Sequence, residues 1–171
     1  LTFEVEGNTY TVSGLTTSDP SSKDVCSLTN AISGTAVVKD ANENVVTDQF
    51  TVHTTNGTLE IGARTVTVSV GNTSTEYNGS EQYGLDNYEF NNVVSGQTAT
   101  IDYTPSYGTL VSETPYDNGE YDADSFSVVD ADGNDVTGNY ILGDQTAGTL
   151  TITDRTEKYE ITVVAKSNTN R

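Results

Sequence analysis

The sequence contains no tryptophan and no methionine, and it has one cysteine and one histidine in 171 residues. Cys26 is the single cysteine, so an intrachain disulfide is excluded and the fold depends on packing and hydrogen bonds. A free cysteine without a nearby histidine is expected to behave as a small buried apolar side chain, not as a nucleophile. His53 is the single histidine, which argues against a zinc site or a Ser-His-Asp triad.

Basic residues are also scarce. The sequence has seven Lys and Arg residues and 25 Asp and Glu residues, which gives a formal net charge of -18. Such a surface repels nucleic acids and anionic lipids, so no nucleic-acid partner is expected. No apolar run approaches the roughly 20 residues that a membrane-spanning helix needs, so no membrane insertion is expected. The acidic residues are scattered, which keeps strand edges soluble; alternatively they attract cations such as calcium.

One stretch of the chain occurs twice. The later copy, residues 130–152, reads DADGNDVTGNYILGDQTAGTLTI, and the earlier copy, residues 40–61, reads DANENVVTDQFTVHTTNGTLEI. At an offset of 90 positions, Asp40, Ala41, Asn44, Thr47 and Phe50 correspond to Asp130, Ala131, Asn134, Thr137 and Tyr140. Gly57-Thr58-Leu59 corresponds to Gly148-Thr149-Leu150 at an offset of 91, so the later copy contains one inserted residue. A repeat of this size predicts tandem small domains, not solenoid turns.

A second pattern indicates where modules begin. The apolar alternation of Val66–Val70 returns over Ile161–Ala165 at an offset of 95. We therefore expect a first module over residues 1–64 that lacks its opening strand, a complete module over residues 65–155, and the opening strand of a further module over residues 156–171. The first two modules should meet at Arg64-Thr65.

The segment over residues 156–171 should lack the neighbouring strands with which an opening strand pairs in a complete module. We expect the strand Tyr159–Ala165 either to pair with a neighbouring molecule or to replace the opening strand missing before Leu1.

Turn residues interrupt the chain about every 8 to 12 residues, and no apolar period of 3.6 persists, which predicts strands and no long helix. A first hairpin is expected over Leu1–Val12 with its turn at Gly7-Asn8, and a second hairpin at Asn56-Gly57. The other expected strands are Val25–Ile32, Thr35–Lys39, a continuation from Val45 to Val52, Thr58–Ile61, Val66–Val70, Thr98–Tyr103, Gly108–Ser112 and Phe126–Val129. The fold class is therefore all-β, as tandem small β-sandwich (Ig-like) or β-grasp-like modules.

Three sequence blocks resemble a known family. TVTVSVGNTSTEYNG, DADGNDVTGNY and AGTLTI are similar to the MBG and YDG-type repeat domains of large bacterial cell-surface proteins, which are related to mucus-binding adhesin repeats. The resemblance covers Val66–Arg155 and most of Leu1–Arg64. It implies a repetitive stalk or adhesive region on a secreted, wall-attached protein, with no catalytic residues. The first copy departs from the pattern, because Glu43 stands where the second copy has Gly133, and a positive φ there suits glycine better.

The best metal candidate is a calcium loop formed by Asp130, Asp132 and Asn134 around Gly133. Alternating oxygen ligands around a glycine turn suit this cation, but the twelfth position from Asp130 is Ile141, not the glutamate of an EF-hand. The alternative is an Asx-rich turn between two strands.

An intramolecular isopeptide bond needs a buried lysine beside an asparagine and a catalytic acid. Lys39 and Lys166 are the available donors, and neither has a matching lysine in the neighbouring module. The alternative for both is a solvated charge.

Enzymatic activity is not expected. His53 falls on the strand face opposite Phe50 and Val52, which predicts an exposed histidine. The many carboxylates leave a glycosidase possible in principle, but the sequence singles out no pair.

Tyrosines crowd the middle of the second module. The candidate ligand-binding residues are Tyr103, Tyr107, Tyr116 and Tyr121, because a flat apolar ring with a hydroxyl suits glycan stacking or protein contact. Packing across strands is the alternative.

Taken together, these observations predict a non-catalytic repeat region of a bacterial surface protein, which acts as an adhesin stalk and binds host mucin, glycan or matrix. The near absence of cysteine fits surface proteins of Gram-positive bacteria. Neighbouring repeat modules are the expected partners, together with self-association through strand exchange. The alternatives are a carbohydrate-binding module of a secreted enzyme, and a subunit of an extracellular fibre or pilus.

Overall fold

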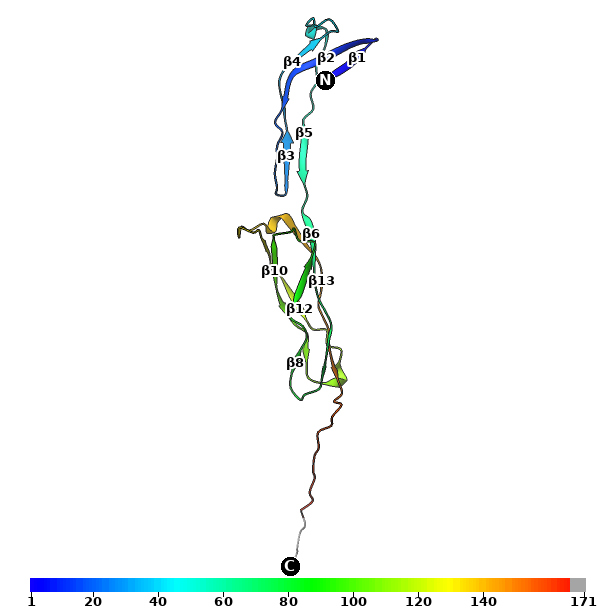
Figure 1. Cartoon of the computed structure of the whole chain (residues 1–171), viewed down its shortest axis with the longest axis vertical. Coiled ribbons are helices and arrows are strands. Elements are labelled where there is room, and N and C mark those ends of the chain that lie inside the picture. The colour runs from blue at the N-terminus through cyan, green and yellow to red at the C-terminus, as the bar shows by residue number, and fades with distance from the viewer. Residues whose placement is uncertain (167–171) are drawn as a thin grey trace, which may run out of the picture. The chain divides into compact units, whose positions relative to one another are not determined.

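A computed structural model describes residues 1–166, and strands dominate it (Figure 1). The expected all-β class is confirmed, because the helices within these residues are 3₁₀ turns of three residues each. No helix in this part of the chain is long and apolar enough to cross a membrane. The chain divides into two compact units, Leu1–Ala63 and a second unit that begins at Arg64.

The first unit contains an antiparallel sheet in the order β1-β2-β4, formed by β1 (Thr2–Val5), β2 (Asn8–Thr17) and β4 (Ile32–Lys39). The predicted first hairpin is confirmed, but its turn is Glu6-Gly7, one residue earlier than expected. Both turn residues have positive φ, 49° and 80°, as a two-residue type I′ turn requires. Asn8 already belongs to the ladder, where it pairs with Val5.

A second sheet of the first unit pairs β3 (Cys26–Asn30) with β5 (Gly57–Ile61). The hairpin predicted at Asn56-Gly57 is wrong, because residues 51–56 form no strand and β5 pairs with the distant β3. The side chain of Asn56 instead accepts the backbone N–H of Ile32 at 2.9 Å. Asn56 therefore fixes the chain beside the start of β4.

The strand predicted from Val45 to Val52 is also wrong. Thr47–Gln49 forms a 3₁₀ turn, η1. The cause is a side-chain bond, since Thr47 Oγ1 accepts the N–H of Val38 at 2.9 Å. The N–H of Val46 also donates to the carbonyl of Val38 at 2.8 Å. These bonds hold the segment against β4 and interrupt any strand at this point.

The second unit is larger. Its elements are β6 (Arg64–Val70), β7 (Thr73–Glu76), β8 (Gln82–Tyr83), β9 (Tyr88–Asn91), β10 (Thr98–Thr104), β11 (Tyr107–Gly108), η2 (Val111–Glu113), β12 (Glu120–Val129), η3 (Thr137–Asn139), β13 (Tyr140–Thr146) and β14 (Leu150–Thr153). β10 pairs with β12 and β8 with β11, both antiparallel. The strand predicted over Gly108–Ser112 is wrong, because β11 ends at Gly108 and η2 begins at Val111.

The strands at the start of the second unit pair with the strands at its end. β6 lies between β13 and β9, and it runs parallel to β13 and antiparallel to β9. β7 pairs in parallel with β14. The first two strands of the unit are thus bonded to its last two.

The predicted alternation of the opening strand is confirmed by burial. Val66, Val68 and Val70 are 0%, 1% and 6% exposed. Val66 forms the main apolar cluster with Val128 and Tyr140. The core of the second unit is therefore organised around β6.

The first unit has a much smaller core. Val38 is the one fully buried large apolar side chain among residues 1–63. Three rings of this unit pack together, since the ring centroid of Phe50 lies 5.5 Å from that of Phe3 and 4.9 Å from that of Tyr10. Val45 and Val52 remain 64% and 37% exposed. The first unit therefore buries little apolar surface for its length.

The duplicated sequence folds into the same local structure twice. We call residues 38–50 and 128–140 the repeat corners. In each, a strand ends in an Asp turn, and a Thr side chain then accepts the N–H of a fully buried Val. The equivalent hydrogen bonds are Val38–Thr47 and Val128–Thr137 (2.9 and 2.8 Å), Asp40–Asn44 and Asp130–Asn134 (both 3.0 Å), Val46–Val38 and Val136–Val128 (2.8 and 2.9 Å), and Gln49–Val46 and Asn139–Val136 (3.0 and 2.9 Å).

Glu43 does not change the repeat corner. Its φ is 67°, and that of Gly133 at the equivalent position is 83°. A residue with a Cβ pays a conformational cost there that glycine avoids. Lys39 forms an ion pair with Glu43 at 2.8 Å between Nζ and Oε2. The hydrogen bonds of the repeat corner thus impose the left-handed conformation even on a glutamate.

The strand that precedes each repeat corner is also paired alike. Val12 of β2 lies opposite Val38, and Ala99 of β10 lies opposite Val128. Both ladders shift register after the next residue, Ser13 in β2 and Thr100 in β10. The likeness of the two units therefore extends beyond the duplicated sequence.

The segment after β14 is not a strand. Residues 157–166 belong to no ladder, and Ile161 and Val163 are 84% and 88% exposed. The strand expected over Tyr159–Ala165 is therefore wrong, and so is the expectation that it adds to the first unit within one chain. Its pairing with a neighbouring molecule stays a prediction. The rest of the predicted further module, residues 167–171, lies outside the described residues.

Substitution of two glycines tests whether the second repeat corner requires a positive φ at position 133. Replacement of Gly133 by alanine should destabilise the second unit by about 1–2 kcal/mol, because a Cβ is disfavoured at its φ of 83° although no atom lies within 4 Å of the added carbon. Gly138→Ala is the matched control, since its site is equally open and its φ is not positive. Urea unfolding followed by circular dichroism measures both variants. Equal stability of the two would contradict the strained conformation at position 133.

Candidate ligand-binding surfaces

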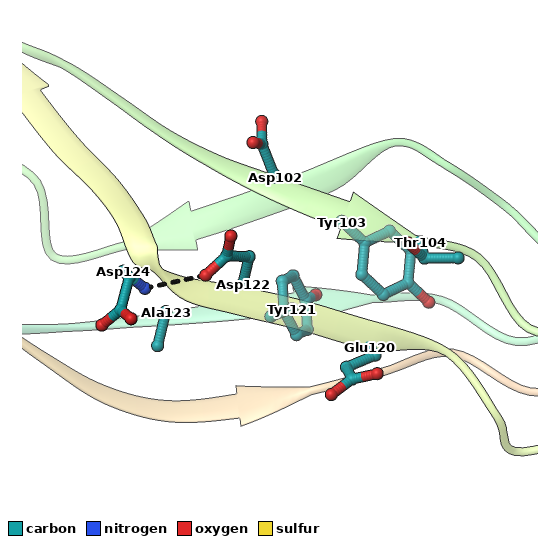
Figure 2. Close-up of a pocket in the computed structure, with 8 residues that line it drawn as sticks. All are labelled: Asp102, Tyr103, Thr104, Glu120, Tyr121, Asp122, Ala123 and Asp124. Carbon is teal, nitrogen blue, oxygen red and sulfur yellow. Dashed lines mark hydrogen bonds between the residues drawn. The ribbon is translucent and has the colours of Figure 1, made fainter.

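A shallow acidic cavity lies on the β10–β12 pair. Its volume is about 370 Å³, and Figure 2 shows the side chains around it. The lining residues are Asp102, Tyr103 and Thr104 from β10, and Glu120, Tyr121, Asp122, Ala123 and Asp124 from β12. Four of these eight side chains are carboxylates, so the cavity suits a cation or a donor-rich polar ligand better than an anion.

The strand register brings the carboxylates together. Asp102 lies directly opposite Asp122, and Thr104 lies opposite Glu120. Ser125 sets the shift of register in this ladder, because its Oγ accepts the N–H of Asp102 at 2.7 Å and donates to the carbonyl of Asp122 at 2.6 Å. Like charges opposite each other in a ladder are unfavourable, so the cavity retains a local electrostatic strain.

Tyr103 and Tyr121 pack on each other. Their ring centroids are 4.4 Å apart, and the planes are tilted by 35°. The hydroxyl of Tyr121 donates to the carbonyl of Thr146 at 3.2 Å, and that of Tyr103 accepts the N–H of Gly148 at 3.3 Å. Burial raises the pKa of Tyr121 to about 12, and the neighbouring Tyr103 and Tyr88 add to the shift. The hydroxyl groups of these two tyrosines therefore join β10 and β12 to the end of β13 and to Gly148 just after it.

Tyr116 supports a loop. Its hydroxyl accepts the N–H of Leu110 at 2.8 Å and donates to the carbonyl of Leu110 at 2.9 Å. Its ring lies against Gly108, where a Cβ would stand 2.1 Å from the nearest ring atom. The ring and the hydroxyl are both engaged in local packing.

Tyr107 is the predicted tyrosine that remains open to a ligand. It lies opposite Tyr83 in the β8–β11 ladder, with ring centroids 6.1 Å apart. Tyr83 and Tyr107 are 57% and 41% exposed. The hydroxyl of Tyr83 donates to the carboxylate of Glu81, and this bond raises the pKa of Tyr83. We call Tyr83 and Tyr107 the tyrosine pair; it offers two adjacent aromatic faces.

The sequence alone did not identify Tyr83 as a site residue. It lies 24 positions before Tyr107, and strands of two residues each bring the two rings together. Strands this short leave no alternation in the sequence, so their pairing could not be predicted from it.

The calcium candidate forms an Asx turn. Asp130 Oδ1 accepts the N–H groups of Asp132 and Asn134 at 3.0 and 2.9 Å. The side-chain amide of Asn134 donates to Asp130 Oδ2 at 3.0 Å. No group of three or more His, Cys, Asp or Glu side chains that could hold a metal ion occurs among residues 1–166.

The first repeat corner forms the same turn. A hydrogen bond from the Asn44 side chain holds the pKa of Asp40 below its usual 3.8, and the backbone N–H groups of Asn44 and Asn42 contribute. The charged form of the turn aspartate is thus favoured by the turn itself.

The remaining candidate residues lie apart. Lys39 is engaged with Glu43 at a partly exposed site, and Lys166 is exposed, so neither has the buried surroundings that an isopeptide bond needs. His53 is exposed and outside any strand, which corrects the strand expected there. Cys26 is half-buried in β3 opposite Ile61. The structure brings none of these four to the acidic cavity or the tyrosine pair.

The chain matches no protein-family model, no curated protein and no solved structure.

Proposed function

We propose that this chain is part of the repetitive, non-catalytic region of a secreted bacterial surface protein, where it acts as a stalk that also contacts host glycan or mucin. In this proposal the two units are tandem modules of the β-sandwich or β-grasp-like kind. The repeat corners support it, because a duplicated structure with the same hydrogen bonds is the mark of a module array.

The parallel pairing of β6 with β13 is the observation that carries the stalk function. The chain enters the second unit at Arg64, in β6, and its last strand, β14, ends at Thr153. Tension on a stalk pulls these two ends apart. Since β6 runs parallel to β13 and β7 parallel to β14, the pull loads the ladder hydrogen bonds together in shear, which resists force better than opening them one at a time.

The surface charge also fits a stalk. A net charge of -18 keeps an array of modules soluble and prevents its strand edges from associating at random.

The tyrosine pair supports the adhesive part of the proposal. Two exposed rings on neighbouring strands form an apolar platform, and the carboxylate of Glu81 adds a hydrogen-bond acceptor beside it. Sugars present C–H faces and hydroxyl groups, which such a surface contacts through stacking and hydrogen bonds. The same surface supports the alternative, a carbohydrate-binding module of a secreted enzyme.

Pulling the chain by its ends tests the stalk function. The second unit should unfold as one event at a force several-fold above that of the first unit, whose end strands β1 and β5 lie in different sheets, and it should release roughly 300 Å of extended chain. Single-molecule force spectroscopy measures both values in the same molecule, so the first unit serves as the internal control. Unfolding of both units at the same low force would contradict a load-bearing role.

Mucin and glycan-array binding tests the adhesive function. Replacement of both Tyr83 and Tyr107 by alanine should reduce binding at least tenfold without loss of fold, since both side chains are largely exposed. Tyr159→Ala removes an exposed tyrosine whose ring contacts Arg155, and it should bind as the parent chain does. Unchanged binding by the double variant would rule out the tyrosine pair as the contact.

A further inference from the structure

The body of the second unit has no positive side chain. The residues between Arg64 and Arg155 include 15 Asp and Glu residues and no Lys, Arg or His. All the strands from β7 to β14 lie in this run. No side chain of these strands can therefore offer a positive charge to a ligand, and the field around them favours neutral or cationic partners.

Two carboxylates adjoin the tyrosine pair. The carboxylate of Glu81 accepts a hydrogen bond from the hydroxyl of Tyr83. Asp117 directly precedes Asn118, whose side chain is bonded to the backbone of Tyr107. Both acidic residues are exposed. A ligand that rests on the two rings therefore meets negative charge beside them.

The tyrosine pair is held in place before a ligand arrives. Asn118 Oδ1 accepts the N–H of Tyr107 at 2.8 Å, and its Nδ2 donates to the carbonyl of Tyr107 at 3.1 Å. Gln82, next to Tyr83 in β8, is 9% exposed, and its Nε2 donates to Thr75 Oγ1 at 2.8 Å. Both short strands are thus fixed by side-chain bonds, so little ordering of the rings opposes binding.

The pair offers hydrogen-bond acceptors and no cationic donor. The carboxylate of Glu81 accepts hydrogen bonds from sugar hydroxyl groups. Proteins usually recognise carboxylate and phosphate groups with Arg or Lys side chains, which are absent from these strands. An acidic group on a glycan would therefore lose water without gaining a charged donor, and it would face Glu81.

From these contacts and charges we infer that the tyrosine pair takes uncharged sugars and rejects glycans whose ends carry carboxylate or sulfate groups. The inference rests on the proposed adhesive function and adds the chemical class of its ligand. The rings stack on the C–H face of a neutral sugar, and Glu81 accepts one of its hydroxyl groups. Sialic acid and sulfate on a mucin therefore mask the ligand, and the uncharged chains carry the contact.

The selectivity depends on the nearest charges. At physiological ionic strength the Debye length is about 8 Å, so distant carboxylates of the unit contribute little. Two exposed carboxylates beside the rings should weaken the binding of an anionic sugar by about fivefold. Added salt screens this repulsion and leaves the stacking of rings on a sugar in place.

Binding to one mucin preparation, before and after sialidase removes its sialic acids, tests the inference. Biolayer interferometry at low salt should show that the intact chain binds the treated mucin about fivefold or more tightly than the untreated mucin. The ratio of the two affinities should fall towards one in 1 M salt, where the Debye length is about 3 Å. The chain with both Tyr83 and Tyr107 replaced by alanine should bind neither preparation.

A matched pair of variants tests whether the selectivity arises at the tyrosine pair. Glu81→Gln removes one charge but keeps a side-chain carbonyl oxygen, and it should reduce the affinity ratio by about twofold. Asp132→Asn removes one charge from the second repeat corner, which lies at the end of the unit away from β8 (Figure 1), and it should leave the ratio unchanged. Both side chains are exposed, so both variants should fold. Equal ratios in the two variants would overturn the assignment to the pair.

The other outcomes separate the inference from the function on which it rests. Equal affinity for the two mucin preparations, or tighter binding to the untreated one, would overturn the inference and leave the adhesive function standing. A preference that persists unchanged in 1 M salt would also overturn it, because the size of sialic acid and not its charge would then be the cause. Absence of binding to both preparations would overturn the adhesive function, and the inference with it.

Discussion

The parallel ladder between the opening strand β6 and the closing strand β13 is the interaction on which the rest of the second unit depends. It places Val66 and Val68 in the centre of the unit, where they are 0% and 1% exposed. Eight of the nine buried apolar side chains in residues 1–166 belong to this unit. Residues 1–63 contain the same repeat corner but form only antiparallel ladders, and Val38 is the one buried apolar side chain among them.

The repeat corner shows how a weak sequence signal encodes a precise structure. Its essential residues are an Asp that accepts backbone N–H groups, an Asn four positions later, and a Thr that accepts the N–H of a buried Val. Each is a local bond from a side chain to the backbone, and such bonds compete successfully with strand formation. Glu43 shows their strength, because it adopts a positive φ where its counterpart is glycine.

The predictions from sequence succeeded where the structure is governed by alternation over several residues. Val66–Val70, the first hairpin and the all-β class could be predicted because one buried face imposes a period of two. The strand from Val45 to Val52 failed, because the bond between Thr47 and Val38 is invisible in the pattern. The hairpin at Asn56-Gly57 failed because β5 pairs with β3, about 30 residues earlier. Which strands pair over such sequence distances depends on tertiary packing, and turn residues carry no information about it.

The candidate site, too, could be predicted from the sequence only in part. The crowding of tyrosines in the second unit was evident, but the role of each ring depends on its partner across the ladder. Tyr103 and Tyr121 face each other, whereas Tyr107 lies beside Tyr83 near the surface. Composition could therefore indicate an aromatic surface, and only the strand register separates rings that pack from rings that are open to a ligand.

The central claim is that the parallel opening strand β6 completes the core of the second unit. Hydrogen exchange of the backbone amides, measured by mass spectrometry or NMR, tests it most directly. The account predicts that the amides bonded in the β6–β13 ladder exchange only as fast as the whole unit unfolds, whereas residues 51–56, which belong to no ladder, exchange fast. Exchange of residues 140–146 as fast as that of residues 51–56 would contradict it.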